Sequence, residues 1–304
     1  MSTVGLFDIL VIDRSHGRFT LKCDAPSVPC DASNLVVTAV AALVDSVAKG
    51  SSAGLIASLN SSNHLTEKEM GGDARDSDVE PRNREGGATT DFGLSVALQK
   101  RIPVGAGLGG GSSDGAFTLR ALNHLWNLNW PRQRLMEIAK SIGSDVPFFL
   151  NAPSAIVRGR GEVVEKTEQP AGKWAPIIIP VAQMPTPAAY AKFDQMRLGK
   201  ESNLVPEPPW SQWLKLNSQD LLPLLINDLE PAAFAIDPQL GRLRSDLESL
   251  LKRTVRMSGS GSSLFSLYDQ RQEADAAARL VKKRYKLQVL TVEFAPAMPD
   301  LLNE

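Results

Sequence analysis

The sequence is poor in the residues that build metal sites and disulfide frameworks. It has two cysteines, Cys23 and Cys30, and three histidines, His16, His64 and His124. The histidines lie far apart and lack the spacing of metal ligands, and two cysteines are too few for a disulfide framework. We therefore expect no metal held by protein ligands alone, and a reduced cysteine pair of the kind found in cytoplasmic proteins.

Long apolar runs and a surplus of charge are also missing. No apolar stretch reaches the roughly 18 residues of a membrane span, and no basic segment followed by an apolar one stands at the start. The formal net charge is −1, which provides no basic surface for nucleic acid. The sequence thus predicts a cytoplasmic protein that binds neither membranes nor nucleic acid.

The sequence does contain ample core-forming material. Its 304 residues are 43% hydrophobic and 22% charged, which is ordinary for a globular protein and enough for about two domains. Periodicity predicts strands at 6–12, 19–22, 54–59, 94–98, 177–181, 264–268 and 289–294, a hairpin at 155–164, and helices at 34–48, 113–126, 131–142, 240–251 and 272–285. This pattern predicts an α+β fold, with an N-terminal domain at 1–169 and a C-terminal domain at 170–304.

Residues 63–91 differ in composition from the segments around them. They carry charges of both signs and several glycines, with hardly any large apolar side chain. Such a segment cannot bury enough surface to offset the entropy lost on ordering. We expect a mobile surface insertion between two strands, and the alternative is a functional lid.

A glycine-rich loop between a predicted strand and a predicted helix is the feature around which the sequence is organised. It reads Pro103-Val104-Gly105-Ala106-Gly107-Leu108-Gly109-Gly110-Gly111-Ser112-Ser113-Asp114. A helix N-terminus leaves N–H groups free, and glycines let a ligand approach the backbone, so the loop predicts a polyphosphate site. The hydroxyls of Ser112 and Ser113 are candidate helix caps. A flexible linker is the alternative.

Of two known phosphate-binding motifs, this loop matches the glycine spacing of one and lacks the required residues of the other. It is not a Walker A motif, because no Lys-Ser/Thr pair follows the last glycine. Gly105, Gly107 and Gly110 do match the Gly-x-Gly-x-x-Gly fingerprint of dinucleotide-binding oxidoreductases. That fingerprint needs an acidic residue about 20 positions later for the ribose, and none stands between His124 and Pro131.

A carboxylate and a second loop of small residues complete the candidate site. Asp145 stands before the apolar block 146–150. It is either a turn or cap residue, or a base that accepts the proton of a substrate hydroxyl. The second loop covers 258–263 and reads as a tight turn between a strand and a helix. Two such loops favour a shared phosphate site. Separately, the pattern around Trp210 and Trp213 predicts that these side chains anchor the core.

These stretches resemble the GHMP small-molecule kinases. The resemblance rests on 100–114, on Asn123-x-Leu125-Trp126 and on 143–149. The triple glycine before Ser-Ser-Asp, together with 159–162, 227–230 and 258–262, is most similar to the group that acts on 4-(cytidine 5'-diphospho)-2-C-methyl-D-erythritol. The resemblance covers most of residues 6–294.

The resemblance implies a fold and an activity. The fold would be the two-domain GHMP kinase fold, with an N-terminal mixed-sheet domain and a C-terminal α/β sandwich, and with ATP, Mg²⁺ and substrate between them. Residues 103–113 would cradle the ATP phosphates. Asp145 would be the base that activates the 2-hydroxyl of the cytidine diphosphate-linked methylerythritol, a step of non-mevalonate isoprenoid biosynthesis.

The sequence departs from this family at its start. Members begin with a strand carrying Pro-Ala-Lys-Ile-Asn-Leu and an Asp-Gly-Tyr-His turn, before the equivalent of residues 3–8. The lysine that would accompany Asp145, and the tyrosine and histidine that would hold cytosine, have no counterpart here. Three hypotheses follow: an active kinase whose start codon lies upstream, a relative that binds ATP without catalysis, and a dinucleotide-binding oxidoreductase.

Overall fold

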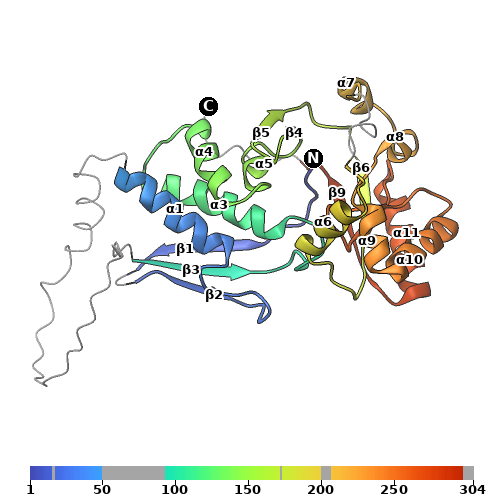
Figure 1. The fold of residues 1–304 in the computed structure, drawn as a ribbon, viewed down its shortest axis with the longest axis horizontal. Coiled ribbons are helices and arrows are strands. Elements are labelled where there is room, and N and C mark those ends of the chain that lie inside the picture. The colour runs from blue at the N-terminus through green and yellow to red at the C-terminus, as the bar shows by residue number, and fades with distance from the viewer. Residues whose placement is uncertain (16–17, 50–92, 172, 200–206, 297–304) are drawn as a thin grey trace, which may run out of the picture.

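The computed structural model describes residues 1–15, 18–49, 93–171, 173–199 and 207–296. The chain forms two halves, each built on a β-sheet with helices packed against it (Figure 1). This arrangement agrees with the α+β prediction. The strand predicted at 54–59 and the insertion predicted at 63–91 lie outside the described residues.

The sheet of the N-terminal half is mixed. Strand β3 (Leu94–Gln99) lies between β1 (Ile9–Arg14), which it pairs with in antiparallel, and β2 (Thr20–Cys23), which runs parallel to it. Alternate side chains of β3 are buried, as expected for a strand with one face on the core. Strand β1 starts later than predicted, because the residues before it bond to other parts of the chain: the Gly5 N–H donates to the Glu293 carbonyl at 2.7 Å.

Helices cover one face of this sheet (Figure 1). They are α1 (Leu35–Lys49), α3 (Gly110–Leu125), α4 (Arg132–Ile142) and α5 (Val146–Leu150). Their apolar faces form a continuous core with Leu43, Leu119 and Leu135 fully buried. As predicted, α4 lies between Pro131 and Gly143, since proline suits a helix start and glycine a helix end.

The C-terminal half is built on an antiparallel sheet of order β7-β8-β6-β9. Its strands are β6 (Lys173–Ile179), β7 (Arg256–Met257), β8 (Leu264–Phe265) and β9 (Gln288–Phe294). The helices are α6 (Thr186–Gln195), α7 (Trp210–Trp213), α8 (Ser218–Leu224), α9 (Glu230–Ile236), α10 (Pro238–Leu251) and α11 (Arg271–Tyr285). Helices α9, α10 and α11 bury apolar side chains against the sheet.

A hairpin and the first residues of the chain connect the two halves. Strands β4 (Ala155–Arg158) and β5 (Val163–Lys166) form the predicted hairpin, and β5 leads to β6, where we propose the domain boundary. The Thr3 N–H donates to the Pro153 carbonyl at 2.9 Å, and the Thr3 carbonyl accepts from the Ala295 N–H at 2.8 Å. Residues 3–5 are therefore bonded to both halves. In the described part of the chain, no helix combines the length and apolarity needed to cross a membrane.

Candidate functional site

The glycine-rich loop has a backbone that only glycine adopts readily. Gly105, Gly107 and Gly109 have φ angles of 68°, 72° and 68°, in the left-handed region that strains other residues. Helix α3 then begins at Gly110, with Gly109 as its N-cap and without a side-chain cap. The prediction that Ser112 or Ser113 caps the helix is wrong, because the helix starts early enough to include both serines in its first turn.

The start of α3 points unpaired N–H groups out of the helix. The Ser113 N–H donates to the Gly109 carbonyl at 2.9 Å, and this bond opens the helical ladder. The N–H groups at 110–112 have no acceptor within the helix, as in every helix N-terminus. The helix dipole adds positive potential at the same place, so this end of the helix favours an anion.

The second loop packs directly on the first. The Ser258 hydroxyl donates to the Gly107 carbonyl at 2.8 Å, and the Ser263 N–H donates to the Ala106 carbonyl at 3.1 Å. A Cβ atom on Gly107 would lie 2.8 Å from backbone atoms of Gly261 and closer still to the Ser258 carbonyl oxygen. The two loops thus meet backbone to backbone, and the phosphate site that they would share stays a prediction.

The second loop connects two strands, not a strand and a helix as predicted. It runs from β7 to β8, and the Ser258 N–H closes it by donating to the Ser263 carbonyl at 2.9 Å. The Asn227 side-chain amide donates to the carbonyls of Met257 (2.9 Å) and Gly259 (2.8 Å). Asn227 therefore holds the loop in place from the segment before α9.

Asp145 lies in the turn between α4 and α5, and its side chain does not cap α5. The tip of the β4–β5 hairpin packs against this turn. A Cβ atom on Gly161, which has a φ angle of 115°, would lie 2.7 Å from the Ser144 carbonyl carbon. Part of the Asp145 side chain is exposed, but the surrounding protein partly desolvates the carboxylate and raises its pKa above the ordinary value.

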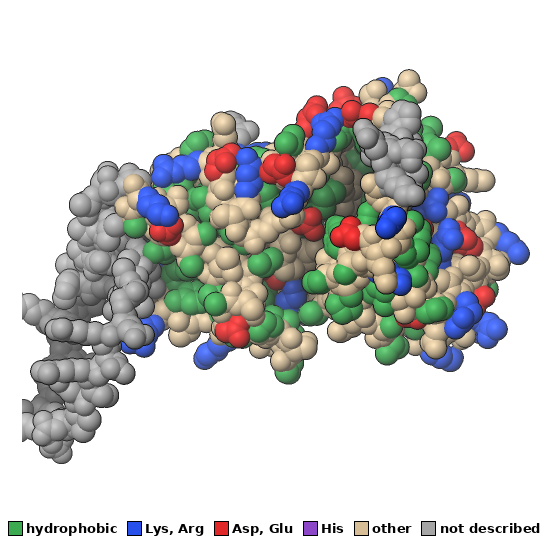
Figure 2. All heavy atoms as spheres, in the orientation of Figure 1, with side chains coloured by type: hydrophobic (Ala, Val, Ile, Leu, Met, Phe, Trp, Pro, Cys, Tyr) green, Lys and Arg blue, Asp and Glu red, His purple; other side chains and the backbone are tan. Residues whose placement is uncertain are grey.

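A cavity of about 590 Å³ lies between the halves, and Figure 2 shows the hollow between them. The chain's first residues, both loops and Asn227 contribute to its wall, and much of the rest is aromatic. Among the described residues that line it, Asp145 is the only one with an acidic or basic side chain. An ionic group of a ligand in this cavity would therefore meet backbone dipoles and, among the side chains of that set, a single charged one, the Asp145 carboxylate.

The candidate site residues fall into two groups by position. Those that line the cavity are Gly107, Leu108, Gly109, Ser113 and Asp145, whereas Pro103, Val104, Gly105, Ala106, Gly110, Gly111 and Ser112 lie outside the lining. Gly110 instead packs against Ile102, because a Cβ atom placed on it would lie 2.9 Å from the Ile102 side chain.

The prediction that the tryptophans anchor the core holds in part, because Trp213 packs against the buried apolar cluster that includes Ile177 and Leu222. Trp210 and Trp213 are both half-buried and line the cavity, with their ring centroids 5.5 Å apart in an edge-to-face arrangement. They form the short helix α7, which stands away from the two sheets (Figure 1), so neither ring is enclosed by core on all sides. The pattern of the surrounding sequence gave no sign that they face a cavity.

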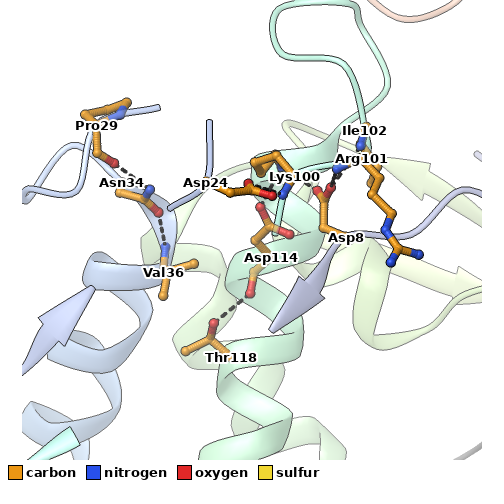
Figure 3. A network of polar contacts seen from close by, with 10 residues as sticks. All are labelled: Asp8, Asp24, Pro29, Asn34, Val36, Lys100, Arg101, Ile102, Asp114 and Thr118. Atoms are coloured by element: carbon orange, nitrogen blue, oxygen red, sulfur yellow. Dashed lines mark hydrogen bonds and ion pairs between the residues drawn. The ribbon is translucent and has the colours of Figure 1, made fainter. Parts of the chain in front are cut away.

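A buried ionic cluster beneath the loop escaped the sequence analysis (Figure 3). The Lys100 ammonium group bonds to the carboxylates of Asp8 and Asp114, the latter at 2.8 Å. Burial raises the pKa of Asp114 to about 6, although Lys100 acts in the opposite direction. Burial alone would lower the pKa of Lys100, but its bonds to Asp114 and Asp8 outweigh this and raise it. Asp8 and Lys100 are 92 residues apart, a separation that no local pattern reveals.

Two further polar residues, Asn34 and Thr186, have structural hydrogen-bond partners. The side-chain oxygen of Asn34 accepts from the Val36 N–H at 2.9 Å, and the side-chain amide group of Asn34 donates to the Pro29 carbonyl at 2.7 Å (Figure 3). Thr186 is the first residue of α6, and its hydroxyl lies 2.9 Å from that of Ser260 in the second loop.

Comparison with known proteins agrees with this geometry. The chain matches the N-terminal domain of GHMP kinases over residues 80–152 and their C-terminal domain over residues 209–287. It is 38% identical over 189 residues to 4-diphosphocytidyl-2-C-methyl-D-erythritol kinase of Thermodesulfovibrio yellowstonii, covering 62% of this chain and 66% of that one. It is 37% identical over 203 residues to the same kinase of Chlorobium phaeobacteroides, covering 65% of this chain and 69% of that one. The chain belongs to the GHMP kinase family.

Within the GHMP kinase family, the solved structures give the same grouping. A crystal structure of 4-(cytidine 5'-diphospho)-2C-methyl-D-erythritol kinase superposes with a TM-score of 0.65 and 26% identity, over 95% of this chain and 87% of that one. The alignment to the T. yellowstonii relative spans 66% of that protein's length, and the alignment to a relative from Prochlorococcus marinus spans 65%.

Membership of the GHMP kinase family removes the oxidoreductase hypothesis. The Gly105, Gly107 and Gly110 match is present, and a strand and a helix flank it as the fingerprint requires. However, β3 is antiparallel to β1, whereas dinucleotide-binding folds use a mostly parallel, doubly wound sheet. The glycines of this member of the GHMP kinase family serve a different fold.

Proposed function

We propose that this protein transfers the terminal phosphoryl group of ATP to the 2-hydroxyl of 4-(cytidine 5'-diphospho)-2-C-methyl-D-erythritol. The observation that carries the proposal is that Gly107, Leu108 and Gly109 of the glycine loop, Ser113 in the first turn of α3 and the Asp145 carboxylate line one cavity between the two halves. The names of the relatives supply the substrate. Non-mevalonate isoprenoid biosynthesis is the route in which this step would stand.

The glycine loop would hold the phosphates of ATP. The N–H groups at 110–112 offer donors at the helix start, and the glycines at 109, 110 and 111 place no side chain in front of them. Phosphoryl transfer depends mainly on positioning and on neutralising charge on the transferred oxygens, and a fixed row of amide dipoles supplies both. Mg²⁺, bound as the ATP complex, would supply the remaining positive charge.

Asp145 would accept the proton of the attacking hydroxyl. Its raised pKa brings the carboxylate closer to the operating pH, which makes it a stronger base than an ordinary aspartate. Because it is the only acidic or basic side chain among the described cavity residues, no basic side chain of that set offsets its charge. The backbone dipoles at the start of α3 would then provide most of the protein's stabilisation of the negative charge on the phosphate oxygens.

The aromatic part of the cavity would accommodate the cytidine end of the substrate. Nucleobases stack on aromatic side chains, and the walls carry Phe148, Phe149, Trp210 and Trp213.

The test combines turnover with ATP binding. ADP release is measured with ATP, Mg²⁺ and the cytidine diphosphate-linked methylerythritol, and ATP affinity is measured by calorimetry. We expect turnover by the unchanged protein, and for D145N a loss of turnover of at least about 100-fold with nearly unchanged ATP affinity. Near-normal turnover by D145N would refute its role as the base.

The same experiment separates the kinase from the remaining alternative. ATP binding without ADP release by the unchanged protein would identify a nucleotide-binding relative that has lost catalysis. Absence of both would refute the proposed function. Turnover with ATP and substrate, abolished in D145N, would establish it.

A further inference from the structure

The two ends of the glycine loop are joined beneath it by buried charged groups. Lys100 stands just before the loop and Asp114 just after it, and their side chains meet at 2.8 Å. Asp8 holds the same ammonium group from the opposite side. We call Asp8, Lys100 and Asp114 the ionic clasp. All of its side chains are at most 7% exposed, so solvent does not screen their interactions.

The clasp also fixes the backbone from which the loop departs. The second carboxylate oxygen of Asp8 accepts from the N–H groups of Arg101 and Ile102, at 2.5 Å and 2.8 Å. The Lys100 N–H donates to Asp24 at 2.8 Å. Figure 3 shows these carboxylates converging on residues 100–102 from different segments. The backbone before the loop is therefore held at three consecutive residues.

On the far side of the loop, the clasp reaches the first turns of α3. A Cβ atom on Gly110 would lie 3.3 Å from the Lys100 ammonium nitrogen, so this charge lies against the first residue of the helix. Asp114 lies one turn along the same helix, and its backbone carbonyl accepts from the Thr118 hydroxyl at 2.8 Å. The segment that would present amides to the ATP phosphates is thus anchored through Lys100 to the strand before the loop.

The loop itself has little else to fix it from below. Three of its residues are glycines with left-handed φ angles, and glycine has the largest conformational freedom in an unconstrained chain. Its tip bonds to the second loop through Gly107 and Ala106, but that loop belongs to the other half of the molecule. Within the loop's own half, the clasp is the polar anchor, and it acts beside the packing of Gly109 on Phe149 and of Gly110 on Ile102.

We propose that Lys100 is a positioning residue, which joins the two ends of the glycine loop through Asp8 and Asp114 and so preorganises it for the phosphates of ATP. This inference rests on the proposed function for the identity of the ligand. Removing the clasp leaves the donors of the loop in place but spreads them over more conformations, so binding energy is lost in ordering them.

The experiment compares variants of the full chain. The K100M variant leaves the carboxylates of Asp8 and Asp114 buried without a cation, and we expect this to destabilise the folded state. K100M/D114M also removes one of those carboxylates, while Asp8 keeps its two backbone donors. The matched control is K49M, which breaks the exposed pair of Lys49 with Asp45 (2.6 Å) on α1. ATP affinity is measured by calorimetry, turnover by ADP release, and loop order by hydrogen exchange of the amides at 103–113.

For K100M/D114M we expect the Kd and KM of ATP to rise about tenfold or more, with kcat within about threefold and exchange accelerated mainly at 103–113. K49M should match the unchanged protein. An ATP Kd within about twofold of the unchanged protein's would overturn the proposal. Exchange accelerated throughout the N-terminal half, with a matching loss of Tm, would overturn it too, because the clasp would then be a general structural element.

Failure of the proposed function gives a different result. If the unchanged protein binds no ATP, the kinase proposal fails, and the exchange measurement decides on the clasp alone. In K100M/D114M, hydrogen exchange accelerated only at residues 103–113 would then support a clasp that orders the loop for another anion. Unchanged hydrogen exchange in this variant would overturn the proposed role of the clasp.

Discussion

Replacing Gly107 by alanine should separate the two loops of the site. Gly107 has a φ angle of 72°, so any other residue is strained there. Its new Cβ atom would also lie 2.8 Å from backbone atoms of Gly261 and nearer still to the Ser258 carbonyl oxygen. Backbone cannot rotate away as a side-chain end can, so one of the loops must move.

Gly105 provides the matched control. Its φ angle of 68° imposes nearly the same backbone strain, but its new Cβ atom would have its nearest neighbours at 3.7 Å, in the Gln183 side chain. The G105A variant therefore measures strain alone, at about 1 to 2 kcal/mol. For G107A, overpacking adds about 1 to 3 kcal/mol, for a total of about 2 to 5 kcal/mol.

The assay is urea unfolding of both variants, followed by the KM for ATP. G107A should lose more stability than G105A, by the overpacking contribution, and should show the larger rise in KM, because the loop tip no longer rests on the Ser258 hydroxyl. Equal losses of stability in the two variants would refute the reasoning, since they would mean that the loops are not in backbone contact.

Two further predictions concern the carboxylates. The G161A variant should lower kcat by about tenfold or more, because its Cβ atom would displace the turn that carries Asp145. The control is G159A, which also has a positive φ angle but whose Cβ atom would meet the Glu162 side chain. Equal kcat values in the two variants would contradict the role of Gly161 in positioning Asp145. The raised pKa of Asp114, about 6, means that the folded state binds a proton more tightly than the unfolded state. This carboxyl therefore contributes stability at low pH that is lost as the pH rises from about 4 to about 6, by up to about 3 kcal/mol. Because Asp114 faces Lys100 and Asp8, urea unfolding of the D114N variant should remove this contribution to the pH dependence, and an unchanged pH profile would show that Asp114 does not titrate in that range.

The parts of the fold that local pattern determines were predictable. Strand β3, helix α4 and helix α11 lie within one or two residues of their predicted bounds. The spacing of apolar residues along each of these segments is enough to predict a strand or a helix. The glycine loop was predictable for the same reason. The start of α3 was missed because serine is a common cap, whereas here the left-handed Gly109 precedes the helix.

What the sequence could not reveal depends on contacts between distant segments. The ionic clasp joins Asp8 to a lysine 92 residues away, and each of its members looks like an ordinary surface charge in its own segment. The exposure of Trp210 to the cavity likewise depends on where α7 stands relative to both sheets. Asp145 was singled out as a candidate from its neighbours, but its place in a cavity with no other acidic or basic side chain among the described residues is a property of the assembled fold.

The short segment at residues 3–5 limits how the two halves can move. It is bonded to Pro153 on one side and to Glu293 and Ala295 on the other, and residues 1–4 also line the cavity. A rotation that widened the cavity at this wall would have to break those backbone bonds, whereas one that uses the segment as a hinge keeps them. A hinge motion about residues 3–5 that separated the two loops would in turn have to break the bonds of Ser258 to Gly107 and of Ser263 to Ala106.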